Sequence, residues 1–200
     1  MNRPATNLQN KPQKPTEREA KMAILLGING TGKTTLLQRI LQASGQKCLV
    51  ITPDDAEWRN YPISELHTQE DFVYSGIKRH IFDPDKRNGT LSRLSYFKKG
   101  IIVFDDCRAY LTERTPPELR QMIIRRRQRE IDIFAVGHGF KEVPPVFFTF
   151  LTEVILFRTT DNVAQRKNCL KDYELMAAAQ ARVNRQAIRN PHHYEIIRWQ

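Results

Sequence analysis

The sequence predicts an α/β fold in which a mainly parallel sheet lies between two layers of helices. Short apolar runs of strand length recur along the chain, and segments with apolar residues at helical spacing separate them. Strands that are apolar on both faces are typical of a parallel sheet whose crossover helices bury both sides. A chain of 200 residues is long enough to form one such domain.

Five apolar runs are the predicted strands, at 22–27, 47–55, 98–107, 131–139 and 153–160. A helix is expected at 33–45, where apolar residues recur at helical spacing and Gly45 is a stop signal. A second helix is expected at 116–130 because proline is favoured at the first position of a helix. The segment 161–189 is predicted to be mostly helical.

The chain divides into three predicted regions. Residues 1–21 are polar and proline-containing and are expected to form a disordered basic arm. Residues 22–160 form the core, and residues 161–200 form a basic helical C-terminal appendage of the same domain. The most apolar stretch, 143–157, is too short to cross a bilayer and carries Glu153, so no membrane span is expected.

The cysteines and the start of the chain predict a cytoplasmic protein. Cys48, Cys107 and Cys169 are scattered and form no C-x-x-C pair, so neither a disulfide framework nor a cysteine metal site is indicated. No apolar signal segment opens the chain. A reducing compartment is therefore expected.

The chain is strongly basic, with a formal net charge of +10 and a pI near 9.7. Such a charge favours a polyanionic partner, with nucleic acid first and an anionic membrane surface second. A basic surface without a specific partner is the alternative.

A glycine-rich segment after the first predicted strand fits the pattern G-x-x-x-x-G-K-[ST] with Gly27, Gly32, Lys33 and Thr34. In such a loop, backbone N–H groups and the helix N-terminus bind phosphate, the lysine reaches the β- and γ-phosphates, and the hydroxyl ligates Mg²⁺. A tight turn without a ligand is the alternative. The residues expected to bind a nucleotide are Gly27, Asn29, Gly30, Thr31, Gly32, Lys33, Thr34 and Thr35.

Two aspartates follow the apolar run that ends at Phe104. In a P-loop protein this pattern is typical of the Walker B strand, where Asp105 would hold Mg²⁺ through water. Asp106 stands where many P-loop ATPases carry the glutamate that polarises the attacking water, and its shorter side chain is a departure from that pattern. Helix capping by both aspartates is the alternative. No guanine-specific motif is present, so ATP and Mg²⁺ are the expected cofactors.

A cluster of arginines precedes the fourth predicted strand, and His138 follows that strand. A polar residue at this place can contact the γ-phosphate, and an arginine from a neighbouring subunit can neutralise charge in the transition state. The alternatives are basic residues that favour a helix C-terminus and a histidine that only packs.

Together, "GINGTGKTT", "IIVFDD" and "RRRQREIDIFAVGH" resemble the FtsK–HerA superfamily of P-loop ATPases, which includes DNA translocases, conjugation ATPases and viral genome-packaging ATPases. The resemblance covers residues 22–160. His138 takes the place of a sensor that is usually glutamine. By position, Arg127 matches the arginine that acts across the subunit interface, and Arg126 and Arg129 are alternatives.

The resemblance implies a three-layer α/β/α core with RecA/ASCE-like strand order, in which the sensor strand separates the P-loop and Walker B strands. It also implies a hexameric ring around double-stranded DNA that is bound without sequence specificity. The compact core with a basic tail looks most like a viral genome-packaging ATPase, located in the host cytoplasm or at the virion vertex, with a capsid vertex or portal-type partner. Candidate DNA contacts are Lys78, Arg79, Lys86, Arg87, Arg182, Arg185 and Arg189.

Two other functions fit the same motifs. A nucleotide or small-molecule kinase also carries the glycine loop, and Asp54 and Asp55 could position a substrate hydroxyl. A nucleic-acid-binding protein that uses the P-loop only as a nucleotide-gated switch is the third possibility.

Overall fold

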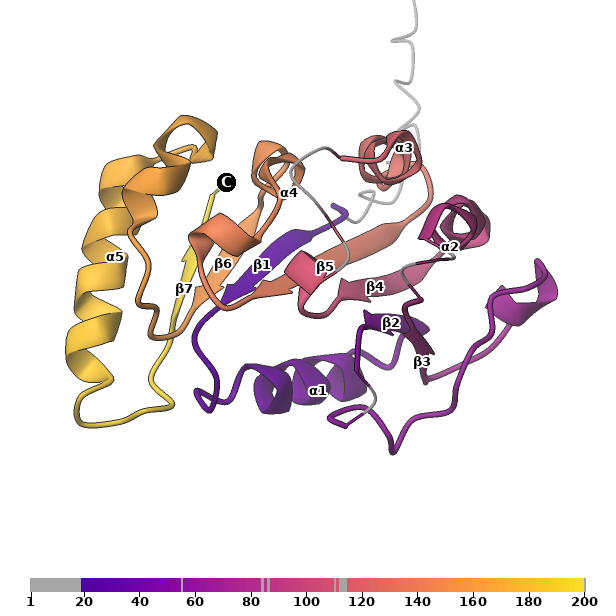
Figure 1. Ribbon diagram of the computed structural model, residues 1–200, viewed down its shortest axis with the longest axis horizontal. Coiled ribbons are helices and arrows are strands. Elements are labelled where there is room, and N and C mark those ends of the chain that lie inside the picture. The colour runs from indigo at the N-terminus through magenta and orange to yellow at the C-terminus, as the bar shows by residue number, and fades with distance from the viewer. Residues whose placement is uncertain are drawn as a thin grey trace, which may run out of the picture.

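Seven strands form one sheet in the order β3-β2-β4-β5-β1-β6-β7 (Figure 1). The computed structural model describes residues 19–54, 56–83, 85, 87–109, 111 and 115–199, with the side chains of 87, 88 and 109 left out. All neighbouring strands are parallel except β6 and β7, which are antiparallel. The predicted mainly parallel sheet is therefore confirmed. The strands are β1 Met22–Leu26, β2 Cys48–Thr52, β3 Ile77–Ile81, β4 Gly100–Phe104, β5 Ile131–Gly137, β6 Glu153–Leu156 and β7 Glu195–Arg198.

The strand β5 lies between β1 and β4, as the RecA/ASCE-like order requires. Leu26 of β1 is in register with Gly137 of β5, and Phe104 of β4 is in register with Ala135 of β5. Because the strands are parallel, their carboxyl ends meet at one edge of the sheet. This edge brings together the segments that follow β1, β4 and β5.

The helices cover both faces of the sheet, so the molecule has the predicted three layers (Figure 1). One face packs against α1, where Leu37 and Leu41 join alternate residues of the strands in one apolar core. The other face packs against α2, α3, α4 and α5 in a second, larger core. The helices are α1 Lys33–Ser44, α2 Arg87–Arg93, α3 Pro117–Arg125, α4 Pro145–Thr149 and α5 Tyr173–Gln186, with short 3₁₀ helices between them.

Two strands and one helix end differ from the sequence prediction. The strand β3 was missed because its sequence, IKRHI, places three basic residues within five positions, and only parallel pairing with β2 makes it a strand. The predicted helix 116–130 is shorter, because α3 ends at Arg125 and residues 126–130 form a turn. The arginines 126, 127 and 129 therefore lie on that turn rather than on a helix.

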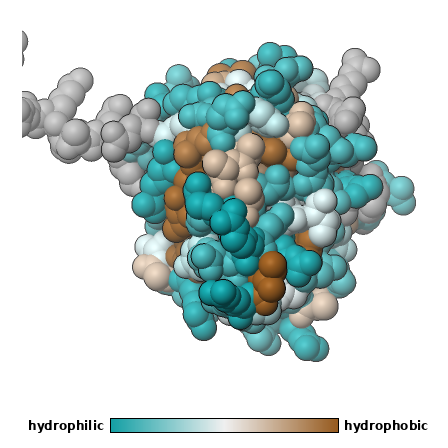
Figure 2. Space-filling view, turned by 90° about the vertical axis from the view of Figure 1, so that its left-hand side faces the viewer, coloured by the Kyte–Doolittle hydropathy of each residue, from teal (hydrophilic) through white to brown (hydrophobic). Residues whose placement is uncertain are grey.

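The C-terminal segment contains helices within residues 161–189, as predicted, and a strand that was not predicted. The helix α5 begins at Tyr173, where the Asp172 side chain accepts a hydrogen bond from the Leu175 N–H, and β7 then adds an antiparallel strand to the sheet. Residues 195–198 are thus part of the core sheet. Figure 2 shows the α5 side of the molecule, which is mostly hydrophilic with small separate apolar patches. None of the helices in the described part of the chain is both long and apolar enough to cross a membrane.

Candidate functional site

The glycine loop connects the carboxyl end of β1 to the N-terminus of α1. Gly27 has no room for a side chain, because a Cβ atom there would lie 2.5 Å from the Cβ of Phe157. Gly32 is the residue before α1 and adopts a left-handed conformation with φ of 92°, which glycine accepts without strain. The Thr31 hydroxyl donates a hydrogen bond to the Ile28 carbonyl at 2.8 Å and fixes the turn from within.

The Lys33 side chain folds back over this loop. Its Nζ atom donates a hydrogen bond to the Ile28 carbonyl at 3.0 Å, and the residue is buried. Burial lowers the pKa of Lys33, while nearby carboxylates, first that of Glu57 and then those of Asp105 and Asp106, act in the opposite direction. The ammonium group therefore lies in a partly desolvated site with excess negative charge around it.

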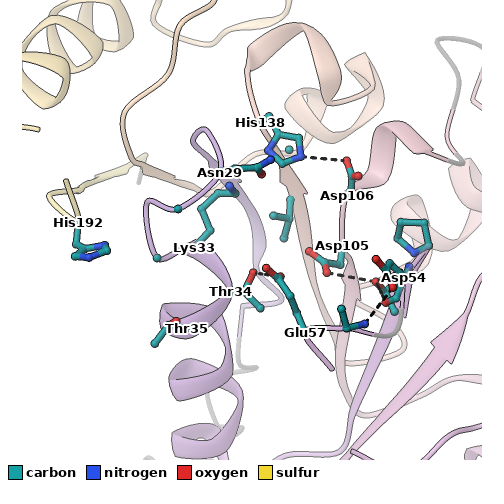
Figure 3. A pocket seen from close by; sticks show the side chains of 17 residues that line it. Asn29, Lys33, Thr34, Thr35, Asp54, Glu57, Asp105, Asp106, His138 and His192 are labelled. Carbon is teal, nitrogen blue, oxygen red and sulfur yellow. Dashed lines mark hydrogen bonds and ion pairs between the residues drawn. The ribbon is translucent and has the colours of Figure 1, made fainter. Parts of the chain in front are cut away.

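A pocket of about 540 Å³ opens between the glycine loop and the carboxyl ends of β2, β4 and β5. Its size is suitable for a small-molecule ligand. Figure 3 shows the side chains of Lys33, Thr34, Asp105, Asp106 and His138 around one space. Of the predicted nucleotide-binding residues, the pocket is lined by Asn29, Gly30, Gly32, Lys33, Thr34 and Thr35, whereas Gly27 and Thr31 shape the loop.

Asp105 is buried at the bottom of this pocket. Its Oδ2 atom accepts a hydrogen bond from the indole N–H of Trp58 at 2.6 Å and a longer one from the Thr52 hydroxyl at 3.5 Å. Burial raises the pKa of Asp105 to about 6, and the Trp58 hydrogen bond acts in the opposite direction. Holding an ionised carboxylate here costs free energy that a cation could recover.

Asp106 turns toward His138 across the mouth of the pocket. Its backbone is left-handed, with φ of 43°, a conformation that aspartate tolerates better than most residues. The Asp106 Oδ1 atom lies 3.7 Å from His138 Nε2, and both side chains are partly exposed. The structure thus places the two predicted residues from β4 and β5 next to each other.

The backbone of His138 is fixed by a hydrogen bond to the Glu142 side chain. The Glu142 carboxylate accepts a hydrogen bond from the His138 backbone N–H at 3.1 Å and forms an ion pair with Arg108 at 2.7 Å. Sequence reasoning did not identify Glu142, since only the turn after β5 brings it back to His138.

Two residues that sequence analysis missed also belong to the site, Glu57 and Trp58. The Glu57 Oε2 atom accepts a hydrogen bond from the Thr34 hydroxyl at 2.5 Å (Figure 3). Trp58 is fully buried in the core beneath α1 and bonds Asp105. No motif marks either residue, because both lie in an irregular segment whose path only the tertiary structure sets.

The other side of the glycine loop faces His192. Its Nδ1 atom lies 3.2 Å from the Thr31 carbonyl oxygen, and Figure 3 shows His192 and Thr35 turned away from Asp105 and Asp106. His192 comes from the segment between α5 and β7, so the C-terminal region also lines the pocket.

The oxygen ligands in the pocket fit Mg²⁺ held jointly with phosphate groups. Within the described ranges, no cluster of three or more histidine, cysteine, aspartate or glutamate side chains is arranged to hold a metal ion. A magnesium ion in a phosphate site needs only one or two carboxylates, since waters and phosphate oxygens complete its shell. The Thr34 hydroxyl and the Asp105 carboxylate, which line the same pocket, are consistent with such a site.

The arginines before β5 lie at the opposite edge of the sheet from this pocket. The seven residues of β5 separate them from His138, which corresponds to about 20 Å along the strand. Arg126 is buried, with its guanidinium over the Phe150 ring at 5.0 Å, and Arg129 donates a hydrogen bond to the Ser95 carbonyl. Arg127 is exposed and pairs with Glu19 at 2.9 Å.

The candidate DNA contacts have different environments. Arg79, one of the candidate DNA contacts, is buried, and its side chain donates hydrogen bonds to the Arg59 and Tyr61 carbonyls within the protein. Lys78 lies over the Tyr74 ring at 4.6 Å. Arg182 forms a bidentate pair with Glu195, whereas Arg185 and Arg189 are exposed. Lys86, the Arg87 side chain, Asp55 and most of the predicted arm lie outside the described residues.

Comparison with protein-family models and with curated protein sequences gives no match. Comparison with solved structures does find matches, and three of them are described below. The genome packaging NTPase B204 of Sulfolobus turreted icosahedral virus 2, in complex with AMP, is 12% identical with a TM-score of 0.67, and the match covers 90% of this chain and 92% of that chain. The DNA-packaging ATPase B204 of Sulfolobus turreted icosahedral virus is 13% identical with a TM-score of 0.66, and the match covers 89% of this chain and 92% of that chain.

VirB4 of Thermoanaerobacter pseudethanolicus is 9% identical with a TM-score of 0.55, and the match covers 84% of this chain and 85% of that chain. These solved structures are FtsK–HerA type P-loop ATPases. At such low identities the likeness concerns the fold. The predicted resemblance is confirmed at that level: this chain has the three-layer P-loop fold of the FtsK–HerA type ATPases.

Proposed function

We propose that this chain hydrolyses ATP and uses the reaction to move double-stranded DNA. The observation that carries the proposal is one pocket that brings the glycine loop together with the acids after β4 and the histidine after β5. Phosphoryl transfer to water depends mainly on positioning and electrostatic stabilisation, and this pocket supplies groups for both.

Each residue has a role that its position supports. Lys33 leaves the Ile28 carbonyl to bind the β- and γ-phosphates, and the loop backbone surrounds them. Asp106 accepts the proton of the attacking water, and His138 orients Asp106 and contacts the γ-phosphate. Mg²⁺, held by Thr34 and through water by Asp105, would neutralise charge on the phosphates.

The nucleotide and the partner are inferred from two further observations. The genome packaging NTPase of Sulfolobus turreted icosahedral virus 2 has been solved in complex with ATP-gammaS and with AMPPCP, which supports an adenine nucleotide here. The net charge of +10 supports a polyanionic partner such as double-stranded DNA. We further propose a hexameric ring that packages a viral genome at a capsid vertex or portal-type partner, with residues 22–160 as its core and 161–200 as an appendage.

The decisive experiment is the ATPase rate of the purified chain with and without double-stranded DNA, measured together with the mass of the assembled species. We expect the rate to rise with DNA and with ring assembly, and the DNA effect to weaken as salt increases because phosphate contacts release counterions. The Lys33→Ala variant should be inactive under all these conditions. DNA-independent turnover by a stable monomer would refute the proposal.

A kinase would give a different product with the same pocket. Asp54 lines the pocket near Glu57, and its carboxylate accepts a hydrogen bond from the Ala56 N–H at 3.1 Å. Transfer of the γ-phosphate to an added acceptor, in place of free phosphate release, would favour that second function.

A further inference from the structure

We infer that Glu57 is a positioning residue for the metal site: it accepts the hydrogen bond of the Thr34 hydroxyl and so directs the oxygen lone pair of that hydroxyl toward Mg²⁺. The inference rests on the proposed nucleotide site and assigns a role to a residue that no sequence motif marks. The observation behind it is the 2.5 Å hydrogen bond from Thr34 Oγ1 to Glu57 Oε2 (Figure 3).

The chemistry of a hydroxyl ligand requires such an acceptor. A threonine oxygen binds a cation through a lone pair, so its hydrogen must point elsewhere and be accepted there. In the structure the Thr34 hydroxyl donates directly to a carboxylate oxygen of Glu57, which is an acceptor of this kind. Outer partners of this kind set the orientation of metal ligands and increase their basicity.

One of the two carboxylate oxygens of Asp105, Oδ2, already accepts hydrogen bonds from other residues of the protein. Its Oδ2 atom accepts from Trp58 at 2.6 Å and from Thr52 at 3.5 Å. Among the described residues, the Thr34 hydroxyl donates to Glu57 and not to Asp105. Two consecutive residues, Glu57 and Trp58, therefore hold the two predicted protein ligands of the metal.

The segment that carries these two residues is docked on α1. The Glu57 carbonyl accepts a hydrogen bond from the Gln38 side chain at 2.9 Å, and the Tyr61 hydroxyl accepts one from Gln42 at 2.9 Å. Trp58 packs its ring 5.8 Å from that of Tyr61 and is fully buried. The Glu57 carboxylate is thus presented to Thr34 from an anchored backbone, as a positioning role requires.

The position of Glu57 separates this role from that of a catalytic base. Glu57 contacts Thr34 at the start of α1, whereas Asp106 and His138 meet each other across the pocket at the ends of β4 and β5 (Figure 3). Replacement of Glu57 should therefore weaken metal binding itself, and this effect should be measurable without ATP hydrolysis.

The test measures Mn²⁺ binding to the full chain in the presence of AMPPCP, with free Mn²⁺ followed by electron paramagnetic resonance. We expect Glu57→Gln and Glu57→Ala to raise the Mn²⁺ dissociation constant, by about 10- to 100-fold for the alanine variant. The matched control is Glu130→Gln, which removes the same charge next to Lys99 at the opposite edge of the sheet and should bind Mn²⁺ like the wild type. Thermal unfolding without metal checks that each variant is folded.

A double-mutant cycle with Thr34→Val decides whether Glu57 acts through Thr34. In the Thr34→Val background, Glu57→Gln should cause no further loss of Mn²⁺ affinity, because the hydroxyl that it orients is absent. Additive losses would overturn the inference, since they would make Glu57 a direct ligand. Wild-type Mn²⁺ affinity in Glu57→Ala, with only the hydrolysis rate reduced, would overturn it in favour of a base.

The two proposals fail in different ways. If the wild-type chain itself binds no AMPPCP with Mn²⁺ present, the proposed function fails and this inference fails with it. If the wild type binds both and the Glu57 variants bind equally well, the inference alone fails.

Discussion

The indole N–H of Trp58 donates a hydrogen bond of 2.6 Å to the Asp105 carboxylate, and both residues are buried. Trp58 belongs to the core beneath α1, and Asp105 follows strand β4. A side chain of the hydrophobic core, Trp58, is therefore hydrogen-bonded directly to Asp105, the residue that is predicted to hold Mg²⁺ through water. Changes at either residue should affect both stability and the site.

Replacing Trp58 with phenylalanine should remove this hydrogen bond and keep most of the buried ring. The buried carboxylate then loses its short donor, which should lower the free energy of unfolding at pH 8 by about 1–3 kcal/mol. Denaturant titration measures the difference. Trp199→Phe is the matched control, because the Trp199 N–H is buried without a hydrogen-bond partner in the described structure. Equal losses in the two variants would contradict the importance of the Asp105 bond.

Asp105→Asn should stabilise the metal-free protein at pH 8 and abolish hydrolysis. The pKa of Asp105 is raised from 3.8 to about 6, so between these values the folded state binds more protons than the unfolded state. The contribution of Asp105 to the free energy of unfolding therefore falls as pH rises from 4 to 6 and stays lower above that range, a difference on the order of 3 kcal/mol. The asparagine variant lacks this loss, and its carbonyl can still accept from Trp58.

Urea titrations between pH 4 and pH 8 test this expectation. The stability advantage of Asp105→Asn should be largest at pH 8 and should disappear near pH 4. Asp85→Asn, which changes an exposed carboxyl group, should show no comparable pH-dependent gain. A constant advantage at all pH values would mean that ionisation of Asp105 is not its cause.

Asp106→Asn should lower the rate of ATP hydrolysis by a factor on the order of 10²–10⁴ while nucleotide affinity is retained. The reason is that the amide keeps the shape of the side chain beside His138 but cannot accept the proton of water. Single-turnover hydrolysis and AMPPCP binding separate the two effects. A variant that keeps more than a tenth of the wild-type rate would remove Asp106 from the role of base.

Arg127→Ala should leave ATP binding intact and stop hydrolysis. Arg127 lies about 20 Å of strand away from its own pocket, so in the proposed ring its side chain would act on the pocket of a neighbouring subunit. Mixing this variant with Lys33→Ala should partly restore the rate, since some interfaces then combine an intact glycine loop with an intact arginine. Absence of restoration in assembled rings would contradict a shared site.

Arg126→Ala serves as the structural comparison for that experiment. The Arg126 guanidinium packs on Phe150 and bonds the Ile123 carbonyl at 3.2 Å, so its loss should lower the free energy of unfolding. Arg127 is exposed, and its removal should have little effect on stability. We therefore expect Arg126→Ala to reduce stability and Arg127→Ala to reduce hydrolysis with little change in stability.

Local sequence patterns were sufficient to predict the glycine loop, the acid pair after β4 and the helix α1 with its Gly45 end. Each depends on residues that are adjacent in the chain, such as Lys33 and Thr34, or on apolar runs that form buried strands. The order of the central strands was predicted only through the resemblance to a known superfamily. Parallel pairing joins segments that are distant in the sequence, so periodicity cannot assign it.

The tertiary structure alone decided the rest of the site and the edges of the sheet. Strands β3 and β7 have weak local signals, because IKRHI is mostly basic and EIIR is short, and pairing with β2 and β6 makes them strands. By itself, the sequence determined which groups could bind a phosphate. Only the packing of the segment after β2 against α1 and β4 determined that Glu57 and Trp58 hold Thr34 and Asp105, because those contacts depend on long-range burial.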